Sequence, residues 1–256
     1  MSAGRDEAET FLYLCIGFVF GIIAFFRGFT IRKKKKLIEN IPTSTIRGMA
    51  MGLVEIQGVA HPFKENLQSP FSKAACVFYH YKIEEHQSSG RSSRWVTIKE
   101  YASPDWFYLQ DGTGEVLVNP AGAEFFLRPD RNYRMGSLMG GTEAQVFEEG
   151  LIYLGISPQG FLGFSRELRC TETYIAPGDE VYVMGTASKN PMVQFSEKGS
   201  ENLCIRKEDG FFCISDKSEK ELLNDMDWKM ILFLYGGPVL TVACLFLMIQ
   251  LYFQYS

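Results

Sequence analysis

Cys76, His80 and His86 are the residues of this sequence that come nearest to a metal site. Zinc uses both residue types and holds its ligands within about 2.0–2.3 Å. Residues 75–84 (ACVFYHYKIE) are rich in aromatic and branched side chains, which predicts a β-strand. On a strand Cys76 and His80 lie about 13 Å apart, because each residue advances the chain by about 3.3 Å. We therefore expect a partly buried cysteine, surface histidines and no metal or other cofactor.

The other nucleophilic side chains form no recognisable catalytic motif. Six cysteines are present, without a Cys-X-X-Cys pair, and only three histidines could serve as a base. Cys204 and Cys213 flank a predicted hairpin turn at Asp209-Gly210, where they become diagonal neighbours about 7–8 Å apart. That separation is too long for a good disulfide. We expect free thiols and no catalytic residues.

Aromatic residues are concentrated in the predicted strands between residues 78 and 108. Successive side chains of a strand point to opposite faces, so about half of these aromatic residues belong in a core. The other half predicts an exposed face that binds a partner or lies against a membrane surface. The candidate partner face consists of Phe78, His80, Trp95, Trp106 and Tyr108.

The middle of the chain is predicted to be a β-rich domain built from antiparallel hairpins, with a barrel-like or sandwich-like arrangement. Turn residues predict two hairpins, one of strands 106–110 and 115–118 and one of strands 203–207 and 211–215. A type II turn is predicted between the successive strands 167–175 and 180–187. A short helical turn is expected within residues 44–52. One amphipathic helix is expected over residues 143–154, because Thr142 and Gln145 form a capping box and Gly155 suits the residue after the helix.

The two ends of the chain carry long uncharged runs, at residues 11–26 and 230–253. The first run continues past Arg27 to Ile31. About 20 helical residues cover the ~30 Å hydrocarbon core of a bilayer, so each run predicts a transmembrane helix. A secretory signal peptide is the alternative for the first run. It fits poorly, because the preceding residues are acidic and no small-residue cleavage site follows.

Basic residues near the two spans predict their orientation. Only Arg5 precedes the first run, whereas it is followed by a basic cluster of Arg32, Lys33, Lys34, Lys35 and Lys36. No charged side chain follows the second run. We therefore expect an integral membrane protein of the cell membrane, with the middle domain in the cytoplasm and both termini outside. The basic cluster is also expected to attract anionic lipid headgroups, by about 1 kcal/mol per side chain.

The predicted organisation is an α+β chain with four parts. They are an extracytoplasmic tail (1–10), a transmembrane helix (11–31), a cytoplasmic domain (32–228) and a second transmembrane helix (229–254). The formal net charge of −4 is mildly acidic, so we expect no nucleic-acid partner. The expected partners are the lipid bilayer and a membrane or cytoplasmic protein.

Seven short segments, in this order and spacing, resemble the GIDE domain, which is also called BAM, for "beside a membrane". They are residues 52–58 (GLVEIQG), 69–70 (SP), 76–81 (CVFYHY), 111–114 (DGTG), 118–120 (VNP), 176–185 (APGDEVYVMG) and 214–219 (ISDKSE). The resemblance covers about residues 37–228 and the flanking spans, and the ISDKSE segment looks most like prokaryotic members. In Mulan-type mitochondrial ubiquitin ligases, this domain lies between two spans and a zinc-binding RING follows the second. This sequence has no RING ligand set before Ser256.

The resemblance therefore implies the membrane-adjacent module without ligase activity of its own. The leading hypothesis is a non-catalytic interaction or sensing module anchored in the membrane. One alternative is a component of an enzyme, such as a ubiquitin-protein ligase (a transferase) that acts with a separate RING-type partner. The other is a structural membrane scaffold.

Overall fold

A computed structural model of the chain describes residues 3–90, 92–135, 142–159, 166–193 and 202–255. The chain divides into two compact units. One combines Met1–Ile41 with Glu219–Ser256 and is helical, and the other is the β-rich unit Pro42–Ser218. Each unit is described by itself.

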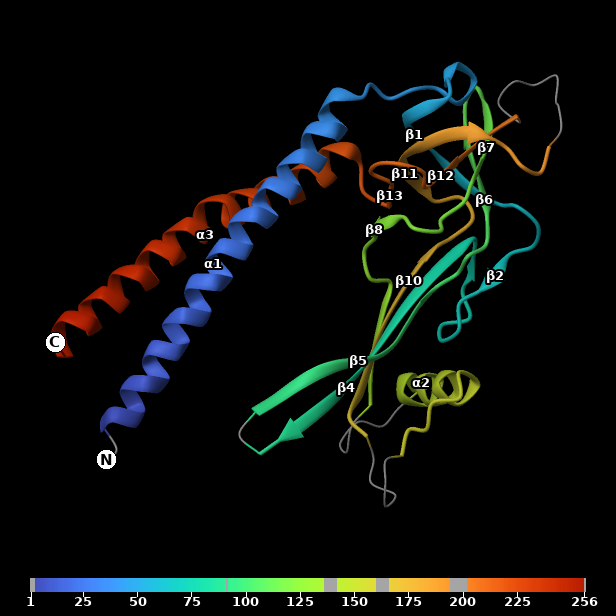
Figure 1. Cartoon of the computed structure of the whole chain (residues 1–256). Helices are drawn as coiled ribbons and strands as arrows, with labels where there is room; N and C mark the ends of the chain where they lie inside the picture. Colours follow the sequence, from blue (N-terminus) through green and yellow to red (C-terminus); the bar gives the residue numbers. More distant parts are fainter. Residues whose placement is uncertain (1–2, 91, 136–141, 160–165, 194–201, 256) are drawn as a thin grey trace. The chain divides into compact units, whose positions relative to one another are not determined.

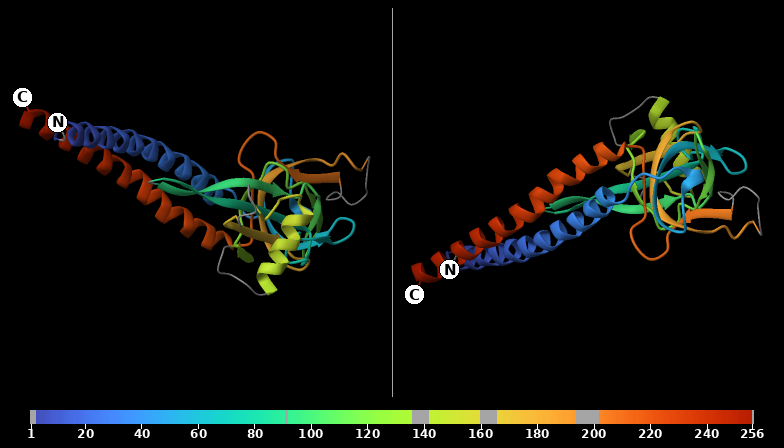
Figure 2. Two further views of the ribbon diagram at one scale, coloured as in Figure 1. Left: turned by 90° about the horizontal axis from the view of Figure 1, so that it is seen from below. Right: turned by 90° about the horizontal axis from the view of Figure 1, so that it is seen from above.

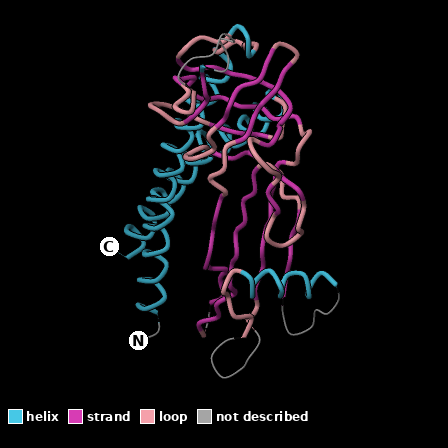
Figure 3. The backbone as a smooth tube through the Cα atoms, turned by 90° about the vertical axis from the view of Figure 1, so that its right-hand side faces the viewer, coloured by secondary structure: helices cyan, strands magenta, loops and turns pink. Residues whose placement is uncertain are grey.

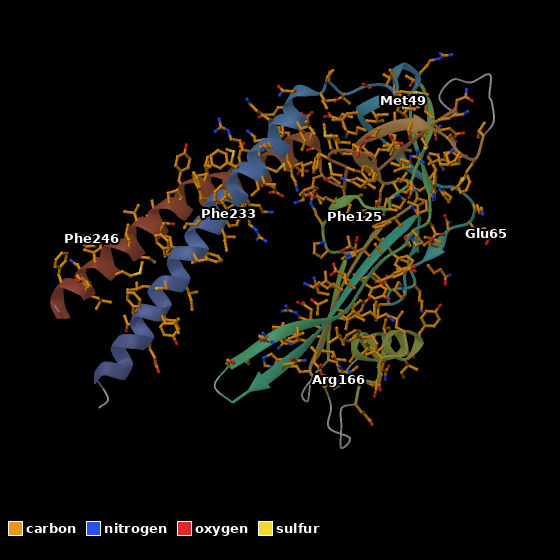
Figure 4. All side chains as sticks on the ribbon, in the orientation of Figure 1. Met49, Glu65, Phe125, Arg166, Phe233 and Phe246 are labelled. Carbon is orange, nitrogen blue, oxygen red and sulfur yellow. The ribbon has the colours of Figure 1, made fainter. Side chains whose placement is uncertain are left out.

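The helical unit is a hairpin of α1 (Ala3–Asn40) and α3 (Glu219–Tyr255). Both helices are long and apolar enough to cross a membrane, with a mean hydropathy of 2.1 and 2.2 over their most apolar windows. Phe233 and Phe246 are among the apolar side chains along α3 (Figure 4). Most of the apolar side chains on these helices are exposed, as expected for surfaces that face lipid rather than a protein core.

Small residues allow α1 and α3 to pack closely. A Cβ atom on Gly28 would lie 2.8 Å from the backbone nitrogen of Leu234, and one on Gly17 would lie 2.8 Å from Cys244 Sγ. Gly21 has the same close approach to Gly237 and Thr241. The helices are antiparallel, so both chain ends lie at the same end of the hairpin (Figure 2). Such small-residue contacts are a usual way for helices to associate in lipid.

The β-rich unit contains a closed barrel of five strands (Figure 1). Around the barrel they are β1 (Gly52–Pro62), β6 (Phe107–Asp111), β7 (Gly114–Val118), β12 (Leu203–Arg206) and β11 (Glu180–Lys189). The pairing of β1 with β11 closes the ring, and every pairing is antiparallel except β7 with β12. Numbered 1 to 5 in chain order, the barrel strands are β1, β6, β7, β11 and β12. Their order around the ring is then 1-2-3-5-4-1, and strands 3 and 5 are parallel, which is the topology of an OB barrel. The barrel-like alternative among the predicted folds is confirmed.

A second sheet of four antiparallel strands is formed by the connections of the barrel. Its strands, in order, are β5 (Ser92–Ala102), β4 (Phe78–Ser89), β10 (Leu168–Ile175) and β9 (Arg131–Met135). The helix α2 (Thr142–Tyr153) lies across one face of this sheet (Figure 3). It encloses a separate hydrophobic core that includes Phe71, Tyr81, Phe147 and Leu151. The short pair β2 (Leu67–Gln68) and β3 (Ala75–Cys76) completes this region.

Several local predictions are confirmed by these elements. The β6–β7 hairpin forms around the predicted turn, with Asp111 paired to Gly114. The predicted helix 143–154 is α2, and Gly155 follows it with a φ of +72°. The predicted helical turn within 44–52 is a shorter 3₁₀ helix, η1 (Ile46–Gly48), which Thr45 caps through its side chain.

The predicted hairpin of residues 203–207 and 211–215 is wrong. The strand β12 pairs with β11 and β7, whereas β13 (Cys213–Ser215) pairs with β11 and with β8 (Glu124–Phe126). Cys204 lies opposite Ser188 and Cys213 opposite Met184, so the two cysteines are not neighbours across a hairpin. The chain does turn at Gly210, which has a φ of +117°. Both segments then pair with successive parts of the longer strand β11 instead of with each other.

The hairpin of α1 and α3 can be tested with a Gly17→Cys substitution in a Cys15→Ser background. The new thiol is expected to form a disulfide with Cys244 under mild oxidation, because a Cβ atom at position 17 would lie 2.8 Å from Cys244 Sγ. Protease cleavage within the middle domain and non-reducing electrophoresis would show whether the two helices stay linked. Val19→Cys is the control, because residue 19 is exposed and should not crosslink. Equal crosslinking from positions 17 and 19 would contradict this register.

The contact between α2 and Phe71 can be tested with Gly150→Ala. Alanine is favoured in a helix by about 1 kcal/mol. Here, however, its Cβ atom would lie 2.7 Å from Phe71 Cε1, and Phe71 is buried. We expect a net loss of about 1–3 kcal/mol of stability, typical of an overpacked core. Thermal unfolding of the full chain in detergent, followed by near-ultraviolet circular dichroism, would measure it. Glu149→Ala, at an exposed position of the same helix, is the control and should change little. A higher melting temperature for Gly150→Ala would refute the contact.

Candidate binding groove at the edge of the barrel

The predicted basic cluster lies in the last turns of α1 and is only partly exposed. Arg32, Lys33 and Lys36 are exposed, whereas Lys34 and Lys35 are half-buried. Lys35 Nζ lies 2.9 Å from a carboxylate oxygen of Glu39 and 2.8 Å from one of Asp227. Lys35 therefore links α1 to α3 within the hairpin, and Arg32, Lys33 and Lys36 are the exposed members of the cluster.

The five residues predicted to form one partner face do not come together. Phe78 is fully buried in the barrel core, where its ring stacks on Phe125 at 4.5 Å. Its inclusion in an exposed face was wrong. Strand β4 contacts two hydrophobic cores, so Phe78 and Tyr81 are both buried although they point to opposite sides of the strand. Alternation along one strand predicts a single buried face and cannot reveal a second core.

Trp95 and His80 lie on the face of the four-stranded sheet that carries the charged side chains. The guanidinium carbon of Arg169 lies 4.3 Å from the centre of the Trp95 ring. Arg169 also donates a hydrogen bond of 2.7 Å to Glu84, which holds the pKa of that carboxyl below its usual value. His80 Nε2 lies 3.1 Å from a carboxylate oxygen of Glu100. These partners are all within the sheet, so this network satisfies its own charges and has the character of a structural surface.

Trp106 and Tyr108 lie beside a groove at one edge of the barrel. The groove has a volume of about 480 Å³ and is lined by Trp106, Phe63, Lys64, Leu67, Asp105 and Met192, among others. Tyr108 supports it from β6, because its ring meets the Phe63 ring edge-on at 5.6 Å. Glu65, on the loop after β1, also belongs to the lining (Figure 4). Phe63 and Met192 were not predicted as site residues.

The groove is built by the connections that follow β1 and β11. The connection from β1 to β6 begins with residues 62–67 and ends with residues 104–106. Met192 lies in the connection that follows β11, the fourth barrel strand in the chain. These two connections, with the faces of the second and third strands, are where OB barrels usually bind ligands. The groove volume is also within the usual range for ligand sites, about 300–1,000 Å³. The only sequence signal for Phe63 is its aromatic side chain directly after Pro62.

The titratable side chains that line this groove are Lys64, Glu65 and Asp105. No histidine or cysteine is among the described residues of its lining. Elsewhere in the domain, burial raises the pKa of Cys76 to about 12 and also raises that of Cys170, so neither thiol ionises near neutral pH. Among the described residues, no group of three or more histidine, cysteine or acidic side chains could hold a metal ion. The groove presents apolar and aromatic side chains with a few charges at its rim, which suits binding.

A comparison with protein families agrees with the resemblance found in the sequence. The model of the GIDE family, described as E3 ubiquitin ligase, matches residues 79–248, which is more than half of the 256-residue chain. The chain belongs to the GIDE family. The GIDE match begins within β4 and continues into α3, so it includes Trp106 and Met192 but not Phe63. No curated protein and no solved structure matches the chain.

Proposed function

We propose that this GIDE-family chain is a membrane-anchored binding module, which does no chemistry itself and recognises a protein segment in the groove beside Trp106. The observation that carries the proposal is the position of this groove. It lies where OB barrels bind ligands, has an aromatic and apolar lining, and lacks converging catalytic groups.

The charges around the groove favour a protein over a nucleic acid as its occupant. Lys64 is accompanied by Glu65 and Asp105, so the rim is mixed in sign. An oligonucleotide site needs a strongly basic surface to neutralise phosphates, whereas this chain has a formal net charge of −4. A protein segment with apolar side chains would fill the groove between Phe63, Trp106 and Met192, with its polar groups at the charged rim.

The membrane is the second part of the proposal. The candidate spans α1 and α3 both join the β-rich unit at the same end of their hairpin, so a membrane-inserted hairpin leaves the domain on one side and both termini on the other. The basic residues after the first apolar run support a cytoplasmic domain. Arg32, Lys33 and Lys36 are then placed to attract anionic lipid headgroups.

The description of the matching family favours a second candidate function. That description is E3 ubiquitin ligase. In this alternative the chain belongs to a ubiquitin-ligase complex and acts with a separate RING-type protein, which supplies the transferase activity. The groove would then be the place where the partner docks, so the identity of the occupant decides between the two candidates.

The orientation can be tested by labelling intact cells with a membrane-impermeant thiol reagent. A single cysteine introduced at Ser2 is expected to react, whereas one at Ser88 is expected to react only after the cells are opened. The unmodified chain gives the background, and five of its six cysteines are buried, which keeps that background low. Labelling at position 88 but not at position 2 in intact cells would overturn the cytoplasmic placement.

The groove can be tested by photo-crosslinking in native membranes. A benzoylphenylalanine at position 64, in the groove lining, is expected to crosslink a discrete protein partner. The same group at Asp209, which is exposed and outside the groove, is the matched control. Trp106→Ala should reduce the crosslink from position 64 by about tenfold or more, the loss typical of a central aromatic anchor.

The outcome also separates the candidates. Crosslinking that is equal from positions 64 and 209, or that is unchanged by Trp106→Ala in a chain with an unaltered circular dichroism spectrum, would refute the groove. A RING-type protein as the groove-dependent partner would favour the ligase-component function over a sensor.

A further inference from the structure

A second pocket lies between the β2–β3 segment, the strands β4 and β5, and the C-terminal end of α2. Its volume is about 580 Å³, and it shares no lining residue with the groove beside Trp106. Four tyrosines and two lysines dominate its lining: Tyr79, Tyr81, Tyr101, Tyr153, Lys73 and Lys99. Neither the predicted partner face nor the polar network of the sheet includes any of them.

The rings of Tyr79, Tyr81 and Tyr101 form one continuous aromatic wall. Tyr81 lies directly opposite Tyr101 on the neighbouring strand, with ring centres 5.8 Å apart. Tyr79 is two residues before Tyr81 on the same face, and these two rings are parallel to within 8°. Burial raises the pKa of Tyr79 to about 12 and also raises that of Tyr81. A tyrosine hydroxyl is protonated near neutral pH even at its usual pKa of about 10, so these groups can donate hydrogen bonds.

The two lysines are held at the rim of this wall by backbone carbonyls. Lys73 Nζ donates a hydrogen bond of 2.8 Å to the Pro70 oxygen and lies 5.0 Å from the centre of the Tyr153 ring. Lys99 Nζ donates one of 3.1 Å to the Leu154 oxygen, at the end of α2. An ammonium group has three N–H donors, so one carbonyl leaves each lysine able to donate further.

Lys73 also has an unusual backbone conformation. Its φ of 56° is in the left-handed region, and no other non-glycine residue in the described parts of the chain has a positive φ. This conformation costs free energy for a residue with a side chain and persists only where the surroundings enforce it. It occurs here in the loop between β2 and β3, where it accompanies the placement of the ammonium group over Tyr153.

The charged side chains in the described lining of the pocket are both positive. They are Lys73 and Lys99, and no acidic residue is among the described lining residues. An aromatic wall with protonated hydroxyls beside two ammonium groups suits a ligand that combines a flat ring with a negative group, since the ring can stack and the anion can pair.

We propose that this pocket binds a small molecule that carries a planar ring and a phosphate or carboxylate group. The ring stacks against Tyr101 and its neighbours, and Lys73 and Lys99 hold the anion. This goes beyond the proposed function, because it adds a small-molecule site to the protein-binding groove. A GIDE-family domain with both sites would bind a small molecule in this pocket and a protein partner in the groove beside Trp106.

Phenyl phosphate is a suitable probe, with inorganic phosphate and phenol as its two halves. The full chain would be placed in phosphatidylcholine nanodiscs, which carry no net lipid charge, and binding followed by saturation-transfer NMR titration. Phenyl phosphate is expected to saturate the site and to bind about tenfold more tightly than either half, because the pocket holds the ring and the anion together. An affinity no better than that of inorganic phosphate would overturn the proposal.

Substitutions then locate the binding. Lys73→Met and Tyr101→Ala should each weaken phenyl phosphate binding by about fivefold or more. Tyr101 is partly exposed, so its replacement is compatible with folding. Lys64→Met is the matched control, because Lys64 also lies over an aromatic ring, Phe63, but in the other site. Binding that survives both pocket substitutions, or that is lost equally in Lys64→Met, would refute the assignment. That result would not contradict the proposed protein-binding groove beside Trp106.

Discussion

The pairing of β1 with β11 is the interaction on which the rest of the domain depends. Eight consecutive residue pairs, from Gly52 with Ala187 to Val59 with Glu180, join strands that are more than 100 residues apart in the chain. They close the barrel and bury its core, including Ile56 and Val183. This pairing is antiparallel, so the end of β1 lies beside the start of β11. The end of β1 reaches the connection after β11 around the rest of the ring, because Pro62 pairs with Phe107, Phe107 with Val118, Val118 with Ile205 and Ile205 with Ala187. The lining residues Phe63 and Met192 meet in one groove for this reason.

The four-stranded sheet is formed by two long connections between strands of the barrel. The connection from β1 to β6 contributes β4 and β5, and the connection from β7 to β11 contributes β9, α2 and β10. Pairing of β4 with β10 joins the two connections, and α2 covers one face of the resulting sheet. The domain therefore has two hydrophobic cores. The aromatic residues of β4 and β5 are divided among the barrel core, the α2 core and the tyrosine wall of the second pocket.

The hairpin of the two candidate spans has a different physical basis. Lipid tails are as apolar as the side chains of α1 and α3, so there is little hydrophobic gain from joining the two helices. Gly17, Gly21 and Gly28 instead let the backbone of α1 approach α3 closely, and Lys35 adds an ion pair to Asp227. The glycine spacing is visible in the sequence, although its meaning depends on which helix it faces. In this chain the partner of the glycine stripe is α3, so the hairpin itself accounts for it.

The sequence by itself determined the features that depend on neighbouring residues. Long uncharged runs gave the two candidate spans, turn residues gave the β6–β7 hairpin, and capping residues gave α2. The order of short motifs indicated the GIDE family. These signals are local, because hydropathy, turn geometry and helix capping act over a few residues.

The tertiary structure alone decided which distant strands pair and what each face of a strand meets. The Asp209-Gly210 turn predicted a hairpin, yet β12 and β13 both pair with β11, since that longer strand offers both of them hydrogen-bonding positions. Phe78 was predicted on a surface and lies in the barrel core. The groove beside Trp106 and the tyrosine pocket join residues from connections far apart in the chain. A strand pattern specifies alternation but not the partner, because backbone hydrogen bonds between strands are the same for any sequence.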